Sequence, residues 1–222
     1  TLIFMSIDST QKSTSGIERK VVAQQDAKVA LSLMEMEIRM ASFNPRFTKG
    51  NWVEPNNCTS KSSTQVYGGI QVATANTIVI QADLDESCKD DENFACMTGP
   101  NEIIRYNYDT DAADRHITRQ VNCNPSPQPF LGAAATSTAV KTVNVINDEI
   151  NIPVFRYFDG AGNDISASVV SSPTSHTVGI PAIRRIDINL AVETQYKDPT
   201  IRDHRRMIYT TSVILRNHAP LP

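Results

Sequence analysis

The chain has 222 residues, of which 40% are hydrophobic and 20% charged, and its formal net charge is −3. This length and balance are typical of one globular domain with a sizeable core. There is no surplus of positive charge to neutralise a phosphate backbone, so the composition argues against nucleic-acid binding. No run of the sequence approaches the roughly 20 apolar residues that span a bilayer.

The first 16 residues are a short apolar segment, 2–5, followed by a polar one. The chain starts at Thr1 without an initiator Met, so we expect a mature or trimmed product. Two interpretations of residues 1–16 stay open: a frayed tail, or the exit of a hydrophobic helix that has been cut away. Ser15 and Glu18 match a capping box, which predicts that a helix begins directly after this segment.

Residues 17–44 are predicted to form one long helix, because apolar side chains recur at alternating spacings of four and three. Pro45 ends it, since the residue before a proline is disfavoured in the α region. At about 1.5 Å per residue the helix is about 40 Å long, more than strands of about 5–6 residues can cover. We therefore expect part of its apolar face, around Val21, Val22 and Ala27, to stay open for another chain. This predicted assembly face comprises Val21, Ala27, Leu31, Met34, Ile38 and Ala41.

Residues 66–222 are predicted to be rich in β-strands joined by hairpin-length links, which favours antiparallel sheets. The expected strands are 70–73, 77–82, 102–108, 116–121, 140–145, 152–158, 183–194 and 207–216. The prolines of 122–129 argue against a strand there, because proline lacks the N–H that a ladder needs. Serine-rich residues 166–175 are expected to form a loop. The predicted fold class is α+β, with one long N-terminal helix packed on antiparallel sheets, long loops and a single domain over 17–222.

Four cysteines lie in loop-like sequence, and none forms a CxxC or has a histidine at zinc-ligand spacing. Their even number favours disulfides and an oxidising compartment such as a periplasm. Three connectivities are possible; the expected one joins Cys88 to Cys96 and Cys58 to Cys123. Unpaired thiols in a cytosolic protein remain the alternative.

No catalytic motif is present: the sequence lacks GxSxG, HExxH and a glycine-rich phosphate loop, so we expect no enzyme and no cofactor. The acidic segment 83–92 is the candidate ligand site. Its start mimics a calcium loop, but Cys88 replaces the turn glycine and Phe94 stands where a bidentate glutamate is needed. The calcium alternative rests on Asp83, Asp85, Asp90, Asp91 and Glu92. A solvated loop held by a disulfide explains the same residues.

The segment QQDAKVALSLMEMEIRMASFNP, residues 24–45, resembles the helix that follows the transmembrane half in minor type IV pilins of the PilW type. Segments 77–85, 101–109, 155–162, 183–194 and 205–217 resemble the family's middle and closing strands. The residues of the helix that match are Gln24, Gln25, Ala30, Leu31, Glu37, Ile38, Arg39, Met40, Ala41, Phe43 and Pro45. The family's basic leader and apolar first helix half are not in this sequence.

The resemblance implies a type IV pilin-like fold and a structural subunit at or near a pilus tip, with roles in assembly and adhesion. It implies that the N-terminal helix packs against other minor pilins and the major pilin. An upstream segment would hold the full-length protein in the inner membrane, with the globular part in the periplasm, before transfer to the pilus at the cell surface. The trimmed chain is expected to be soluble. A J-type pseudopilin of a type II secretion pseudopilus is similar, and a secreted calcium- or carbohydrate-binding β domain is the alternative of another class.

Overall fold

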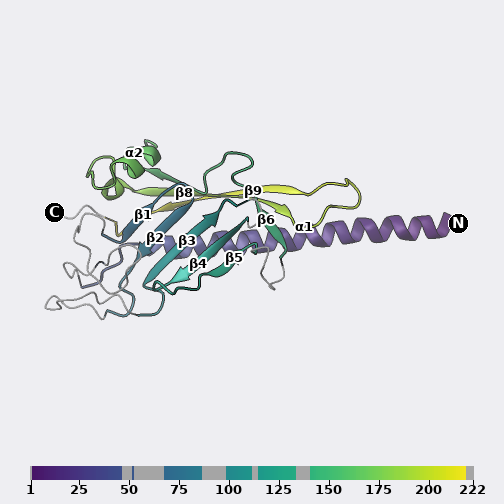
Figure 1. Ribbon diagram of the computed structural model, residues 1–222, viewed down its shortest axis with the longest axis horizontal. Helices are drawn as coiled ribbons and strands as arrows, with labels where there is room; N and C mark the ends of the chain where they lie inside the picture. Colours follow the sequence, from purple (N-terminus) through teal and green to yellow (C-terminus); the bar gives the residue numbers. More distant parts are fainter. Residues whose placement is uncertain are drawn as a thin grey trace.

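A computed structural model describes residues 2–46, 52, 68–86, 99–111, 115–133 and 141–218. These residues form an α+β fold with an N-terminal helix and two antiparallel sheets, which confirms the expected coarse class (Figure 1). The first sheet consists of β1 (Ile70–Ala73), β2 (Thr77–Gln81), β3 (Ile103–Asp109), β4 (His116–Val121) and β5 (Gln128–Leu131). The second consists of β6 (Val143–Val145), β7 (Phe155–Phe158), β8 (Arg185–Thr194) and β9 (Arg206–Ile214). The helices are α1 (Leu2–Arg39), α2 (Ser166–Ser171) and the short 3-10 helix η2 (Ile180–Ala182).

The first sheet is a meander in the order β1-β2-β3-β4-β5. Alternation places Ile104, Tyr106 and Tyr108 of β3 in the core, as the sequence pattern predicts. The expectation that 122–129 excludes a strand is wrong at its end, because Pro129 lies in β5 opposite Thr118. The sheet tolerates it because β5 lies at an edge, where a residue without an N–H costs no ladder bond on the open side.

The second sheet is built on β8, a ten-residue strand. One edge of β8 pairs with β9, and the other pairs with β7 near its start and β6 near its end. Ile186, Ile188 and Leu190 alternate into the core as expected. Residues 166–171 form α2 rather than the predicted loop, a helix too short for a periodic pattern to identify.

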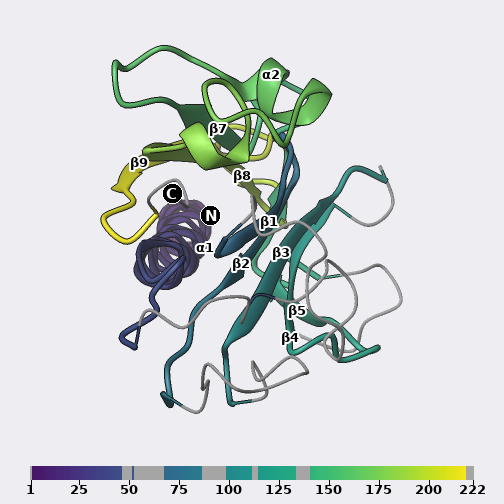
Figure 2. The ribbon, with the colours of Figure 1, turned by 90° about the vertical axis from the view of Figure 1, so that its left-hand side faces the viewer.

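Helix α1 lies in the angle between the two sheets, as the end-on view in Figure 2 shows. It contacts β8 and β9 on one side and β5 on the other. Its buried side chains join one continuous core with the inner faces of both sheets. They recur along one face of the helix: Ala23, Ala27, Ala30, Met34 and Ile38, followed by Ala41 just beyond its end.

The predicted start and end of this helix are wrong. It has 38 residues, begins at Leu2 rather than Ile17, and runs through the expected boundary between 16 and 17 without a break. A capping box marks the start of a helix only where the first N–H groups of that helix lack partners. Here the residues before Ser15 are themselves helical, so those N–H groups are already paired. The helix ends at Arg39, before the predicted 44, and Ser42 takes a positive φ of 65° in the turn that follows.

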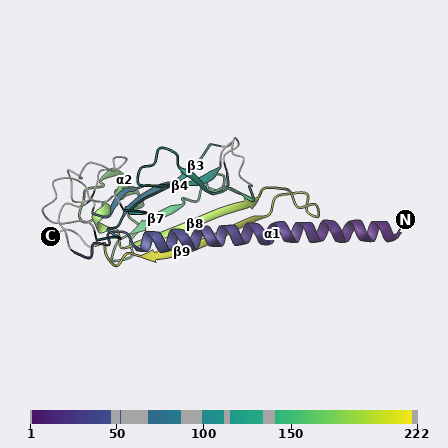
Figure 3. The same ribbon diagram turned by 90° about the horizontal axis from the view of Figure 1, so that it is seen from below.

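The N-terminal part of α1 extends beyond the strands, as Figures 1 and 3 show. The tip of the β8–β9 hairpin reaches the helix at Gly16, where an added Cβ would lie 2.8 Å from Oδ2 of Asp198. The helical residues before Gly16 span about 20 Å at 1.5 Å per residue. None of the described helices is both long and apolar enough to cross a bilayer.

Candidate functional site

The predicted assembly face of α1 is mostly covered by the chain's own sheets. Ala27, Met34, Ile38 and Ala41 are fully buried, and Leu31 is packed against the core. That part of the prediction is wrong, because the strands of two sheets together cover more of the helix than the expected strand lengths allowed. Val21 alone among the six is exposed, at 42%.

A second apolar stripe lies on α1 beside its buried face, along the border between the helix and the globular part. It consists of Val22, Val29, Met36 and Met40, which are 43%, 67%, 58% and 37% exposed. The first three are seven residues apart, and seven residues are about two helical turns, so their side chains line up along the axis. We call these four residues the outer stripe. The expectation that Val21 and Val22 stay open is confirmed, whereas Val29 and Met36 were not singled out because the search was for one core face.

A groove continues the outer stripe toward the first sheet. Met36 and Met40 form one wall, and Ile80, Ala82 and Leu84, from β2 and the residues after it, contribute to the other. Leu84 is itself 42% exposed. The accessible apolar surface therefore runs from the middle of α1 onto the globular part.

Polar contacts fix α1 to the sheets near its C-terminal end. The Arg119 guanidinium on β4 donates to both carboxylate oxygens of Glu37, at 3.1 and 2.6 Å, and the Tyr106 hydroxyl also donates to Glu37. Burial and the Glu37 carboxylate raise the pKa of Tyr106 above its ordinary value. Further along the helix, Thr142 donates to Asp26 at 2.5 Å.

The hairpin between β8 and β9 holds α1 near its middle. Arg19 lies over the ring of Tyr196, with 5.2 Å from its Cζ to the ring centroid. Arg205 donates to Asp198 at 2.5 Å, and this hydrogen bond holds the pKa of Asp198 below its ordinary value. The helix is thus anchored from Gly16 to Glu37 and presents the outer stripe in a fixed orientation.

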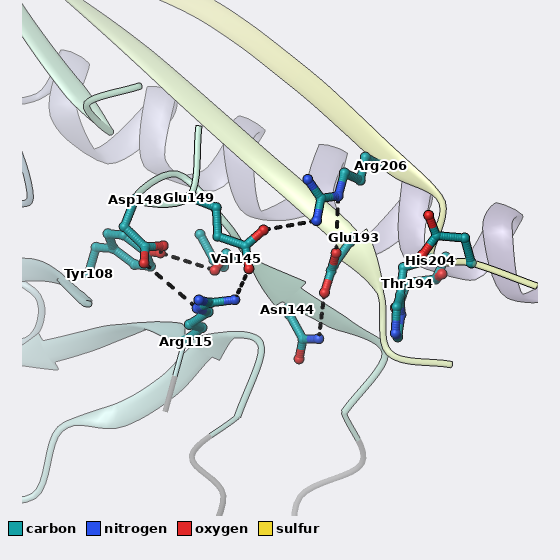
Figure 4. A network of polar contacts seen from close by, with 11 residues as sticks. Tyr108, Arg115, Asn144, Val145, Asp148, Glu149, Glu193, Thr194, His204 and Arg206 are labelled. Atoms are coloured by element: carbon teal, nitrogen blue, oxygen red, sulfur yellow. Dashed lines mark hydrogen bonds and ion pairs between the residues drawn. The ribbon is translucent and has the colours of Figure 1, made fainter. Parts of the chain in front are cut away.

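A network of charged side chains joins the two sheets (Figure 4). Arg115, beside β4, pairs with Glu149 and Asp148, and Arg206 of β9 pairs with Glu149 at 2.9 Å and with Glu193 at 3.4 Å. The dashed lines converge on Glu149, which receives an arginine from each sheet. The network therefore helps to keep the two sheets aligned.

Three carboxylates meet where β2 ends and β3 begins. Oxygens of Asp83, Asp85 and Glu102 all lie within 4.8 Å of one another. Glu102 is almost fully buried and accepts hydrogen bonds from the backbone N–H groups of Leu84 at 2.9 Å, Asp85 at 3.3 Å and Gly99 at 2.6 Å. Asp83 is fully buried, and neither carboxylate oxygen has a hydrogen-bond partner among the described residues. Burial raises the pKa of both Asp83 and Glu102.

The sequence identified two of these three residues. Glu102 was missed because it is 17 residues beyond Asp85, and the antiparallel pairing of Gln81 with Ile103 is what brings it close. The remaining predicted calcium ligands, Asp90, Asp91 and Glu92, lie outside the described residues.

Cys123, just after β4, is disulfide-bonded. Cys58, Cys88 and Cys96 lie outside the described residues, so the expected pairing stays a prediction.

One serine–histidine pair occurs in the described part of the chain. His218 Nδ1 lies 2.7 Å from Ser42 Oγ, and its Nε2 lies 2.8 Å from the carbonyl oxygen of Ile180. Both side chains are buried, and the contact ties the C-terminal segment to the turn after α1. The expectation that the chain is not an enzyme stays a prediction.

Comparison with family models, with curated proteins and with solved structures finds no match to this chain. The class that the structure defines is therefore the coarse one: an α+β protein with a long N-terminal helix held between antiparallel sheets.

Proposed function

We propose that this chain is a structural subunit of a filament of the type IV pilin kind, a minor pilin that packs through α1 against neighbouring subunits. The outer stripe is the observation that carries the proposal. A folded domain has no use of its own for a row of apolar side chains that stay exposed beside the helix face that already fills the core.

The outer stripe has the size and regularity that helix packing needs. Full burial of an exposed Val or Met side chain stabilises an association by about 1.5–3 kcal/mol, before the entropy of association is subtracted. The spacing of Val22, Val29 and Met36 matches the repeat by which side chains of one helix enter holes on another. The projecting part of α1 beyond Gly16 adds length for such packing that the globular part does not cover.

The sequence resemblance to minor pilins of the PilW type supports the finer assignment. In that assignment the partners are other minor pilins and the major pilin. An upstream segment holds the protein in the inner membrane before it joins a pilus at the cell surface. A J-type pseudopilin would use α1 in the same way, and the genes beside this one distinguish the two filaments.

The test is Val29→Asp, introduced into the chromosomal copy of a cell that makes the filament. A charge in the middle of the outer stripe would have to be buried without a partner, so we expect at least a tenfold loss of the subunit from sheared filaments, measured by quantitative immunoblot. The side chain is 67% exposed, so the domain should keep its melting temperature.

The matched control is Val170→Asp, which places the same charge on α2 at a side chain that is 57% exposed. It should leave incorporation unchanged. Equal incorporation of the two variants would contradict the proposal. Substitutions at Ile38 are unsuitable, because this side chain is fully buried in the domain's own core.

A further inference from the structure

We propose that Asp83, Asp85 and Glu102 bind a calcium ion that joins the end of β2 to the start of β3. The proposal does not depend on the filament assignment, since it rests on the chemistry of three side chains within one domain.

The first argument is the state of Asp83. A buried carboxylate normally accepts several hydrogen bonds, because an unpartnered charge away from water is strongly unfavourable. Asp83 is fully buried, and in the part of the chain that the structure describes both of its oxygens lack a hydrogen-bond partner. They lie in one cluster with the carboxylates of Asp85 and Glu102, which repel its charge further. A bound cation supplies the missing partner for Asp83 and offsets the repulsion among the three.

The second argument is the way the site is built. Glu102 is oriented by three backbone N–H groups, as carboxylate ligands of metal ions commonly are by groups around them. Each carboxylate oxygen can accept more than one interaction, so Glu102 keeps capacity for a cation. Gly99 leaves the space open: a Cβ there would lie 2.6 Å from Oδ2 of Asp85 and 2.8 Å from Oε2 of Glu102.

The third argument selects calcium. Two oxygens that each lie about 2.4 Å from a calcium ion are at most about 4.8 Å apart. The oxygens of the cluster meet this limit. The donor set is all oxygen, without the histidine or cysteine that zinc and copper prefer. Calcium accepts irregular geometry and completes its shell with water and backbone carbonyl groups, whereas magnesium demands a regular octahedron.

The charges around the cluster agree with a cation. Arg46 lowers the pKa of Asp83 through its charge, but it also pairs with Glu86 at 3.7 Å. The side-chain charges of Asp85 and Glu86 act on Asp83 in the opposite direction. One arginine therefore faces four carboxylates in this part of the described chain, which leaves the local charge negative.

The test uses the whole chain after removal of divalent ions with EDTA and dialysis. Calcium chloride is titrated into the protein by calorimetry, and the melting temperature is measured with and without 1 mM calcium (roughly 100-fold above a dissociation constant in the sensor range). We expect one calcium per chain, a rise in melting temperature, and binding of magnesium at least tenfold weaker.

Asp83→Asn keeps the shape of the side chain and removes the charge, so we expect at least a tenfold loss of calcium affinity. In EDTA this variant should melt at or above the wild-type temperature, since it no longer buries a charge, and this shows that its loss of binding is not a failure to fold. Glu86→Gln is the matched control, because it removes an equal charge from the same segment at a side chain outside the cluster. Its affinity should stay within twofold of wild type.

Three outcomes overturn the proposal: no heat and no melting shift in the wild type, equal losses in Asp83→Asn and Glu86→Gln, or equal affinity for calcium and magnesium.

Discussion

His218 shows how one buried side chain links stability to pH. In the neutral ring Nε2–H donates to the carbonyl of Ile180 at 2.8 Å, and Nδ1 lies 2.7 Å from the Ser42 hydroxyl, which also donates to the Gly68 carbonyl at 2.9 Å. Burial is the main reason that the pKa of His218 falls to about 4, and the charge of Arg184 lowers it further. Protonation therefore favours the unfolded chain, in which the histidine has its ordinary pKa of about 6.5.

The stabilising effect of neutral His218 is fully present above pH 6.5 and is lost as the pH falls toward 4. We expect this group alone to remove about 3 kcal/mol of unfolding free energy over that interval. Urea unfolding between pH 7.5 and 4.5 measures the slope. His218→Gln should flatten it, whereas His176→Gln, at an exposed position, should leave it unchanged. An unchanged slope in His218→Gln would show that another group is responsible.

At the scale of elements, the turn after α1 crosses the start of β1 with no space between the backbones. A Cβ on Gly69 would lie 2.0 Å from Ser42 Oγ and 2.3 Å from Ser42 Cα, and Gly69 has a φ of +77°. Hydrogen bonds lock this crossing, since Ser42 N–H donates to the Gln81 carbonyl at 2.9 Å and Gln81 N–H donates to the Gly69 carbonyl at 2.7 Å. Only glycine fits the position.

We expect Gly69→Ala to cost about 3 kcal/mol or more of unfolding free energy, from backbone strain and overpacking together. Gly162→Ala is the control. Gly162 has a φ of +87°, but nothing lies within 4 Å of the added Cβ. This variant therefore has the backbone strain without the overpacking and should lose about 1 kcal/mol of unfolding free energy. Urea denaturation of the two variants beside wild type measures the difference. Equal costs would refute the steric argument.

Most elements were predictable from local patterns. β3 and β8 alternate apolar and polar residues, and that period of two is enough to place a half-buried strand. β5 was missed because Pro129 argues against a strand unless its edge position is known. The helix start predicted before Ile17 was wrong because the residues on both sides of the capping pattern are helical, so the pattern does not mark a helix end.

The candidate sites were less predictable, because they depend on which elements meet. The outer stripe requires knowing which side of α1 the sheets cover. The partnership of Asp83 with Glu102 requires the register of β2 on β3. Both the coverage of α1 and the strand register depend on residues far apart in the sequence. The sequence therefore showed the individual residues but not which of them lie together.

At the scale of the whole molecule, the unbroken helix fixes the direction in which its projecting part faces. One Ala inserted between Ser13 and Thr14 should rotate every earlier residue by about 100° around the axis relative to the globular part. We expect incorporation into filaments to fall by at least tenfold, measured by immunoblot of sheared material. A seven-residue Ala insertion restores the direction to within about 20° and should recover part of the loss.

Both insertions lie before Gly16, the point where the β8–β9 hairpin reaches the helix, so the melting temperature of the domain should not change. If the single-insertion variant entered filaments as well as wild type, the orientation of the projecting part would not matter for assembly.

The anchoring of α1 along its length has a mechanical consequence. Contacts at Arg19 and Asp26 in the middle of the helix and at Glu37 near its C-terminal end each hold it sideways to its axis. A pull on the N-terminus along that axis loads these three attachments in shear at the same moment, so none gives way before the others share the force. In the filament subunit proposed above, this arrangement would carry tension from the projecting helix into the globular part without letting the two slide apart.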